Sequence, residues 1–254
     1  MPDEQQQPPQ PSYQPPSQSP SSSPYLIPGS ILVAGVLVAV SILYTSSGTG
    51  SSNYPSDEIV EQPTINLSDA AEEIGLNREA FDECVNSGKY ATAVQGAVQK
   101  AIDAGGNGTP YSVLIGPKGE KVVVSGAQPI ASVKAAIDGL LAGKPITTPK
   151  DPALDKVEPV SDKDHLLGNP SAPVKIVEYS DLDCPFCKTF HATLQQIMED
   201  YGKQGKVAWV YRHFPLAQLH PDAPRKAEAT ECATELGGQQ AFWALTDQIM
   251  SAGI

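Results

Sequence analysis

The segment that most constrains this chain is the tetrapeptide Cys184-Pro185-Phe186-Cys187, which joins two predicted elements of different type. Val174–Tyr179 (VKIVEY) predicts a buried strand, and residues 185–201 carry apolar side chains at helical spacing. Proline is favoured at the first position of a helix, so we expect Cys184 at the N-cap and Cys187 in the first turn. The fold must therefore place two thiols where a strand passes into a helix.

This placement predicts reactive thiols. A thiolate on Cys184 would face unpaired backbone N–H groups and the positive end of the helix dipole, which lower a thiol pKa. Cys187, one turn away, can attack a mixed disulfide on Cys184 and release the bound partner. A structural zinc site would need a second ligand pair, and Cys84 and Cys232 stand alone. Redox chemistry is favoured over zinc and over an inert, strained disulfide; metal binding through Cys184, Cys187 and His191 is a distant alternative, so we expect no metal.

The N-terminal part of the chain has a different composition. Residues 1–25 are rich in Pro, Gln and Ser and predict a disordered tail. Leu26–Tyr44 is apolar, and a helix of this length at ~1.5 Å per residue spans roughly the 30 Å core of a bilayer. A buried soluble helix is the alternative, but the flanks offer no domain to bury it. We therefore expect a membrane anchor at residues 26–45, in contact with lipid through Leu26–Tyr44, and a flexible tether at residues 46–65.

The rest of the chain predicts an α/β protein in two blocks. The elements run in the order ααββα, then a linker, then βαβαα. We expect the first block at residues 66–142, a Pro-rich linker at 143–160 and the second block at 161–254, with no regular element before Val174.

The charge of the chain limits its partners. The sequence has 17 Lys and Arg against 29 Asp and Glu, a net charge of −12. Nucleic-acid binding requires clustered basic residues, so this balance argues against a nucleic-acid partner. Nothing in the sequence indicates an organic cofactor.

Both blocks resemble the DsbA-like thiol:disulfide oxidoreductases, which have a thioredoxin fold with a helical insertion. The second block is similar in DHLLGNPSAPVKIVEYSDLDCPFCKTFH, KVAWVYRHFPL and AEATECATELGG. The first block is similar in IGLNREAFDECVNSGKYATAV, GTPYSVLI and SGAQP. The resemblance covers about residues 66–142 and 161–254, and implies a DsbA-type, thioredoxin-like α/β fold.

The resemblance implies roles for residues around the thiols. Thr109-Pro110 falls at the family's cis-proline loop, which faces the thiols and lets the Thr109 backbone pair with a bound substrate strand. Glu178 matches a buried acidic residue that can relay a proton to Cys187. Pro185 and Phe186 would tune the redox potential. From the sequence alone, Pro110 could equally be a trans turn proline and Glu178 an exposed strand residue.

The resemblance also bears on the other two cysteines. Family members with cysteines at the positions of Cys84 and Cys232 form a second, structural disulfide there, which we expect here. Two buried free thiols are the alternative. We expect His191 to be structural or solvent-facing, and His165, His213 and His220 to be loop residues with no assigned role.

The two blocks stand in the reverse of the family's order, because the block with the thiols comes second. The simplest interpretation is a circular permutation, with new termini inside the helical insertion and the old termini joined through Gly143–Pro173. About 30 linker residues reach up to roughly 100 Å, which exceeds a domain diameter. Two broken copies in tandem, or a truncated reading of a longer tandem protein, would give the same order.

Together these features predict a membrane-anchored protein disulfide oxidoreductase with its N-terminus inside the cell and its catalytic domain outside the cytoplasm. It would form or isomerise disulfides in cysteine-containing exported proteins, and a membrane or soluble redox partner would recycle Cys184 and Cys187. The alternative of a different class is a non-catalytic binding or scaffold domain with an uncoupled active site. The sequence leaves the redox direction open.

Overall fold

The structure is a computed structural model that describes residues 65–145 and 151–252. These residues belong to one compact unit, Val60–Ile254. The expected tail (1–25), the expected anchor (26–45) and all but the last residue of the expected tether (46–65) lie outside the described residues. Within the described ranges, no helix combines the length and the hydrophobicity that crossing a bilayer requires.

The elements follow the expected order closely. The helices are α2 (Leu67–Glu73), α3 (Arg78–Ser87), α4 (Ala91–Asp103), α5 (Ile130–Leu141), α6 (Pro185–Ile197) and α7 (Ala223–Ser251). The strands are β1 (Tyr111–Ile115), β2 (Lys121–Ser125), β3 (His165–Gly168), β4 (Val174–Ser180) and β5 (Val207–His213). A 3-10 turn, η1 (Pro152–Lys156), and a π-helical turn, η2 (Met198–Gly202), complete the list.

Local sequence signals explain several of the helix ends. The Asn77 side chain accepts a hydrogen bond from the Ala80 N–H (2.8 Å) and begins α3, and Gly88, with φ at 64°, ends it. The long helix α7 bends at Gly238, whose backbone angles are not helical (φ 70°, ψ −166°). The last two helices of the expected order are therefore the two arms of α7.

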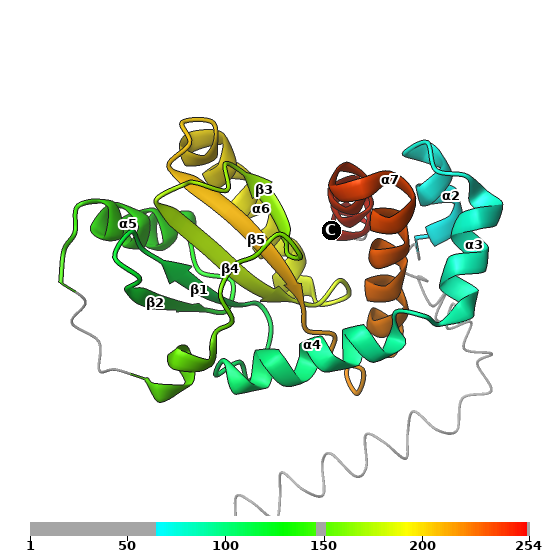
Figure 1. Ribbon diagram of the computed structural model, residues 1–254, viewed down its shortest axis with the longest axis horizontal. Coiled ribbons are helices and arrows are strands. Elements are labelled where there is room, and N and C mark those ends of the chain that lie inside the picture. The colour runs from blue at the N-terminus through cyan, green and yellow to red at the C-terminus, as the bar shows by residue number, and fades with distance from the viewer. Residues whose placement is uncertain (1–64, 146–150, 253–254) are drawn as a thin grey trace, which may run out of the picture. The chain divides into compact units, whose positions relative to one another are not determined.

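Strands from both blocks form one five-stranded sheet in the order β2-β1-β4-β5-β3 (Figure 1). In its centre, β1 of the first block pairs antiparallel with β4 of the second, with Tyr111 opposite Tyr179. β4 and β5 are parallel, and β2 and β3 form the antiparallel edges. The two blocks thus complete one sheet within a single chain.

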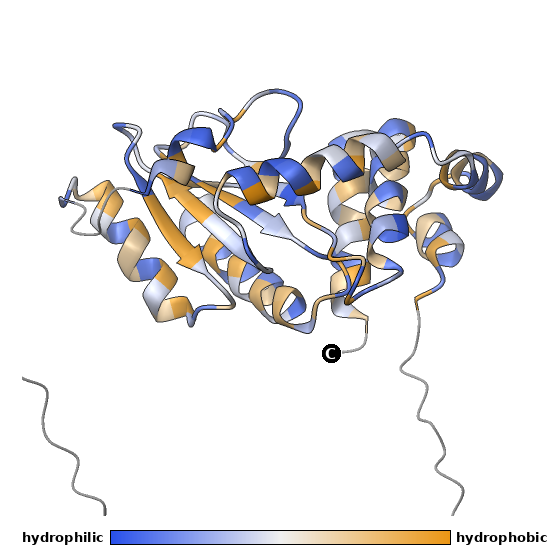
Figure 2. Ribbon diagram, turned by 90° about the horizontal axis from the view of Figure 1, so that it is seen from below, coloured by the Kyte–Doolittle hydropathy of each residue, from blue (hydrophilic) through white to orange (hydrophobic). Residues whose placement is uncertain are grey.

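The sheet buries apolar side chains on both faces. One face, with Leu114, Ile176 and Trp209, packs in a cluster with α5, α6 and α7. The opposite face, with Val113 and Val177, packs against α4 and the segment after η1. In Figure 2 the strands carry orange stretches, and the helices alternate between orange and blue along their lengths, as expected for amphipathic helices over a buried sheet.

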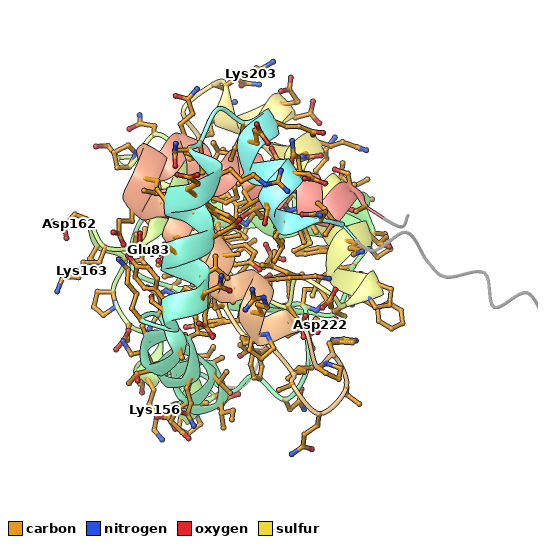
Figure 3. The ribbon with its side chains drawn as sticks, turned by 90° about the vertical axis from the view of Figure 1, so that its right-hand side faces the viewer. Glu83, Lys156, Asp162, Lys163, Lys203 and Asp222 are labelled. Carbon is orange, nitrogen blue, oxygen red and sulfur yellow. A yellow bond between two sulfur atoms is a disulfide. The ribbon has the colours of Figure 1, made fainter. Side chains whose placement is uncertain are left out.

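A helical group of α2, α3 and α7 lies beside the sheet, and α4 runs from this group along the sheet (Figure 1). Charged side chains lie on the outer surface of the domain. The residues labelled in Figure 3 are all charged and exposed: Glu83, Lys156, Asp162, Lys163, Lys203 and Asp222.

Two elements depart from the sequence prediction. β3 and η1 lie in the stretch before Val174 where no regular element was expected. β3 has only four residues, of which His165 alone is buried, so it carries no alternating pattern to be recognised. Its pairing with β5 defines it as a strand, because Leu166 lies opposite Val210.

Candidate active site

The loop between β4 and α6 fixes the position of the thiols. Its central residue is Asp181, whose carboxylate is fully buried. One oxygen accepts a hydrogen bond from the Asp183 N–H (2.8 Å); the other accepts one from the Leu216 N–H (2.8 Å) and lies 2.9 Å from His220 Nδ1. The chain then enters α6 with Cys184 at the N-cap and a proline in the first turn, as the sequence predicts.

The surroundings of Cys184 lower the pKa of its thiol. Both active-site cysteines are free, and Cys184 is buried with only 5% of its surface exposed. A hydrogen bond from the Cys187 thiol lowers the pKa of Cys184 to about 5, against burial, which raises it. The backbone N–H groups of Phe186 and Cys187 lower it further. Cys184 is therefore a thiolate at neutral pH.

Cys187 is held in the opposite state. It is fully buried, and burial raises the pKa of its thiol, as do its hydrogen bond to Cys184 and the negative charge of Glu178. The Asp181 N–H donates to its sulfur over 3.4 Å. The pair thus consists of one ionised and one protonated thiol.

Glu178 is the buried acidic group behind this pair. Its side chain is fully buried on β4, and the Trp209 indole donates to Oε2 over 2.9 Å. Burial raises the pKa of this carboxyl, against the opposing effects of His191, Ser180 and Trp209. Its other oxygen, Oε1, has no hydrogen-bond partner among the described residues. An acid of raised pKa with a free oxygen can give and take a proton.

The structure also places Thr109 and Pro110 against the thiols. The peptide bond between them is cis, and Cys184 Sγ lies 3.6 Å from the Thr109 carbonyl oxygen. The Pro110 carbonyl accepts a hydrogen bond from the Gly126 N–H (2.8 Å), which ties this loop to the end of β2. Residues from the two blocks therefore meet at one site.

His191 is a buried, structural residue, which is the first of the two alternatives that the sequence left open. It is 3% exposed rather than solvent-facing, and its Nε2 lies 2.7 Å from Asp247 Oδ1 on α7. Its ring packs on Trp209, with centroids 4.9 Å apart, and its Nδ1 is buried without a partner among the described residues. Its position four residues after Cys187 was the available signal, but Asp247 could not be foreseen.

The outer rim of the site is apolar and basic. Phe186 is 66% exposed beside Cys184. Lys226 forms an ion pair with Asp183. The pKa of Lys188 is lowered by the burial of its own side chain and by the positive charge of Lys226. Pro185 is exposed on the first turn of α6.

An apolar groove lies near the cis-proline loop. It has a volume of about 820 Å³ and runs between α4 and the segment that follows β5. Ile102 and Leu219 line it and are 49% and 71% exposed, and Asn107, two residues before Thr109, reaches its wall. The groove offers apolar binding surface near the cis-proline loop.

The remaining candidate residues lie away from the thiols, in the helical group and on β3 and β5. Cys84 and Cys232 form a disulfide that joins α3 to α7. Among the described residues, one group has the composition and spacing to hold a metal ion: His165, His213 and Glu231, whose ligand atoms lie within 4.8 Å of one another. The two histidines lie on β3 and β5 rather than in loops.

Comparison with known proteins divides the chain at the same place as its sequence pattern. Residues 56–138 match the DSBA-like thioredoxin domain family, and residues 160–253 match a thioredoxin family. The probable disulfide bond formation protein D of Bacillus anthracis is 38% identical over 84 residues, which are 33% of this chain and 37% of that protein.

Other relatives are also matched over part of their length. The Na(+)/H(+) antiporter NhaA 3 of Salinispora tropica is 39% identical over 99 residues, or 39% of this chain and 14% of the antiporter. The crystal structure of Wolbachia pipientis alpha-DsbA1 is 29% identical and aligns over 37% of this chain and 44% of that chain, with a TM-score of 0.33. The chain thus spans about a seventh of the antiporter and over a third of the Bacillus protein.

Proposed function

The chain has a DsbA-like thioredoxin fold, and we propose that it is a protein disulfide oxidoreductase that reacts through Cys184. The observation that carries this proposal is the contact of Cys184 with both Cys187 and the Thr109 carbonyl oxygen, 3.6 Å from the sulfur. A scaffold domain with an uncoupled site would not need this contact. The single most direct support is therefore geometric: a low-pKa thiol, a resolving thiol and a substrate-facing loop lie together.

The proposed reaction begins from the disulfide between Cys184 and Cys187. A substrate thiolate attacks Cys184 Sγ, which forms a mixed disulfide and breaks the bond to Cys187. Cys187 leaves as a thiolate and takes up a proton. A second substrate thiolate then attacks the substrate sulfur of the mixed disulfide and expels Cys184 as a thiolate. The substrate gains one disulfide, and the protein is left with two reduced cysteines.

Glu178 is the proposed proton donor to Cys187. The charge of Glu178 acts on the pKa of Cys187, and Glu178 Oε1 has no other partner among the described residues. Because burial raises the pKa of the carboxyl, Glu178 holds a proton more readily than an ordinary glutamate and can pass it on when the Cys187 thiolate is released. In the reverse reaction the same group removes the proton from the attacking thiol.

The pKa of Cys184 favours oxidation as the net direction. A stable thiolate stabilises the reduced protein relative to its disulfide, so the disulfide readily accepts electrons from substrates. Isomerisation uses the same thiolate as the attacking group and remains the second activity that this site supports.

The proposed substrates are cysteine-containing exported proteins in an extended conformation. A strand of such a protein would pair with the backbone at Thr109, and its apolar side chains would enter the groove between α4 and residues 214–219. Phe186 and Pro185 would contact the substrate and tune the potential. A redox partner would then reoxidise the two cysteines.

The proposed location is outside the cytoplasm, with Leu26–Tyr44 as a single membrane anchor and the N-terminus inside. The support is the apolar sequence of this segment and the oxidising compartment that the chemistry requires. Deletion of residues 26–44 is expected to move the protein from the membrane fraction to the soluble fraction. Unchanged membrane association of that variant would refute the anchor.

We also propose that the order of the two blocks reflects a circular permutation, with residues 66–142 and 161–254 as the exchanged halves and 143–160 as the linker. Its support is the pairing of β1 with β4, which completes the sheet within one chain. Residues 56–254 should therefore sediment as a compact monomer. An obligate dimer would favour exchange of halves between molecules instead.

The central experiment follows the oxidation of a reduced two-cysteine peptide. Cys184→Ser is expected to abolish turnover, because no sulfur remains to form the mixed disulfide. Cys187→Ser should instead accumulate the mixed disulfide on Cys184, which non-reducing electrophoresis and mass spectrometry detect. Oxidation by Cys184→Ser at the wild-type rate would contradict the proposal.

A further inference from the structure

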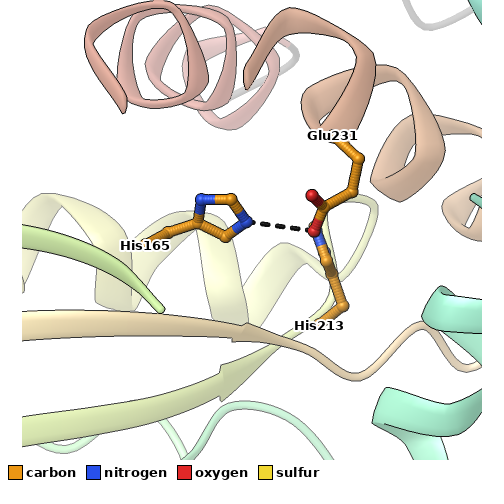
Figure 4. Close-up of side chains that lie close together, drawn as sticks. All are labelled: His165, His213 and Glu231. Atoms are coloured by element: carbon orange, nitrogen blue, oxygen red, sulfur yellow. Dashed lines mark hydrogen bonds and ion pairs between the residues drawn. The ribbon is translucent and has the colours of Figure 1, made fainter. Parts of the chain in front are cut away.

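A second cluster of reactive side chains joins the sheet to the helical group. His165 on β3, His213 on β5 and Glu231 on α7 turn their polar atoms toward one point (Figure 4). Glu231 Oε1 lies 3.0 Å from His165 Nε2 and 3.2 Å from His213 Nε2. The imidazole side chains are 9% and 5% exposed and the Glu231 side chain is 23% exposed, so the cluster is largely buried but accessible from one side.

The hydrogen bond at His165 Nδ1 determines which ring nitrogen of the neutral imidazole carries the lone pair. Gln239 Oε1 lies 3.3 Å from His165 Nδ1, while Gln239 Nε2 donates toward the Asp164 carbonyl over 3.5 Å. An amide oxygen held in this orientation accepts a hydrogen bond from Nδ1–H, which in the neutral ring leaves the lone pair on Nε2. In that tautomer the lone pair faces a carboxylate oxygen, and either a proton or a bound cation between the two atoms removes the repulsion.

No Lys or Arg among the described residues forms an ion pair with Glu231, whose charged partners are the two histidines. The nearest strand cation, Arg212, is engaged by both oxygens of Asp164 (2.8 and 3.2 Å). Phe242 stacks on His165 at a centroid distance of 3.5 Å and holds the ring in place.

We propose that His165, His213 and Glu231 bind a divalent transition-metal ion, for which Zn²⁺ is the best match. Two imidazole nitrogens and one carboxylate oxygen are ligands that Zn²⁺ takes at about 2.0–2.2 Å, which places tetrahedral ligand atoms roughly 3.4 Å apart. The two distances of 3.0 and 3.2 Å need to widen slightly, and the third ligand atom pair, the two imidazole nitrogens, lies within 4.8 Å and needs to close toward 3.4 Å. Ca²⁺ and Mg²⁺ prefer all-oxygen sites, so this set of ligands disfavours them.

A fourth ligand can reach the ion from solvent. The three residues line one wall of a cavity of about 300 Å³ that opens between α4, β5 and the segment before β3. Water entering this cavity would complete a tetrahedral site. The Gln239 contact is the kind of outer hydrogen bond that orients a metal-binding histidine.

Metal binding here would fasten the edge of the sheet to the helical group. The cluster draws one residue each from β3, β5 and α7, which the sequence separates by up to 66 positions. The ion would therefore stabilise the folded protein and would have no direct part in thiol exchange. This role is independent of the proposed oxidoreductase activity.

The test measures Zn²⁺ affinity on the full chain in detergent, in a Cys184→Ser/Cys187→Ser background that removes the other thiolate ligands. Competition with a chromophoric chelator should give one Zn²⁺ per chain. Glu231→Gln and His165→Gln should each weaken binding at least about 10-fold. Glu235→Gln, one turn along α7, and His220→Gln are matched controls and should retain the parent affinity.

Co²⁺ provides a second readout of the same site. It should give the visible absorption bands of tetrahedral Co²⁺ in the parent and lose them in Glu231→Gln. Far-ultraviolet circular dichroism checks that each variant is folded; if Glu231→Gln is not, His165→Gln decides. Absence of stoichiometric Zn²⁺ binding, equal affinity of the ligand variants and the parent, or tighter binding of Ca²⁺ than of Zn²⁺ would each overturn the proposal.

Discussion

The pKa of Cys184 predicts how the reduction potential of the protein depends on pH. The pKa lies at about 5 instead of the ordinary 9.0, because the Cys187 thiol donates to the sulfur and overcomes the effect of burial. Above pH 5, reduction of the disulfide takes up one proton, since only Cys187 is protonated. Below pH 5 it takes up two. The potential should therefore fall by about 30 mV per pH unit above the break and by about 60 mV per unit below it.

The difference between a pKa of about 5 and the ordinary 9.0 also determines how strongly the thiolate stabilises the reduced protein at neutral pH. At pH 7 a thiol of pKa 5 is ionised in all but about 1% of molecules, whereas a thiol of pKa 9.0 is ionised in only about 1%. This favours the reduced protein by at most about 2.7 kcal/mol, or about 60 mV, and less where solvent screens the sulfur. The stabilisation is complete only above the ordinary pKa of 9.0, decreases as the pH falls from 9 toward 5, and is lost below the pKa of about 5, where the thiol is protonated in either case.

The assay equilibrates the protein with glutathione buffers from pH 4 to pH 8 and counts free thiols by alkylation and mass spectrometry. A slope near 60 mV per unit over the whole range would refute the reasoning. Two variants test the cause in a direct titration of the thiolate by ultraviolet absorbance. Cys187→Ala removes the donor and should raise the pKa of Cys184, whereas Cys187→Ser keeps an O–H donor and should raise it less.

Three further predictions test other parts of the site and fold. Glu178→Gln should slow proton transfer to Cys187 and reduce turnover roughly 100-fold in stopped-flow kinetics, while Glu79→Gln on the surface of α3 changes nothing. Removal of the disulfide by Cys84→Ala with Cys232→Ala should lower the free energy of unfolding by about 2–5 kcal/mol in urea titrations, a loss that reductant reproduces in the wild type only. Leu219→Asp should raise KM for a reduced peptide roughly 10-fold at nearly constant kcat, in contrast to the control Val123→Asp on β2.

Local sequence signals were enough to predict most elements and the position of the thiols. The cap at Asn77, the glycine at residue 88 and the proline after Cys184 each act within a few residues, so their effect can be read from the sequence. The same holds for β4, whose burial follows its apolar pattern.

Features that depend on distant residues could not be predicted in this way. Asp181 is an ordinary loop carboxylate in sequence, and its burial is explained only by Leu216 and His220, 35 and 39 residues away. His165 likewise acquires a partner 66 residues along the chain. Such side chains have no periodic pattern, because the fold rather than the local sequence selects their partners.

The register of one strand pair explains why the order of the blocks need not matter to the site. Tyr111 lies opposite Tyr179, so Pro110 and Ser180 lie at the same end of the sheet and bring their loops together. This pairing depends on side chains of β1 and β4 and not on which strand comes first. Thr109 and Cys184 are 75 residues apart in this chain, and the reverse order would lengthen the loop that their contact closes by less than a factor of two. Because each doubling of a loop costs only about 0.6 kcal/mol, the permutation we propose would change the stability of the site by less than the disulfide between Cys84 and Cys232 contributes.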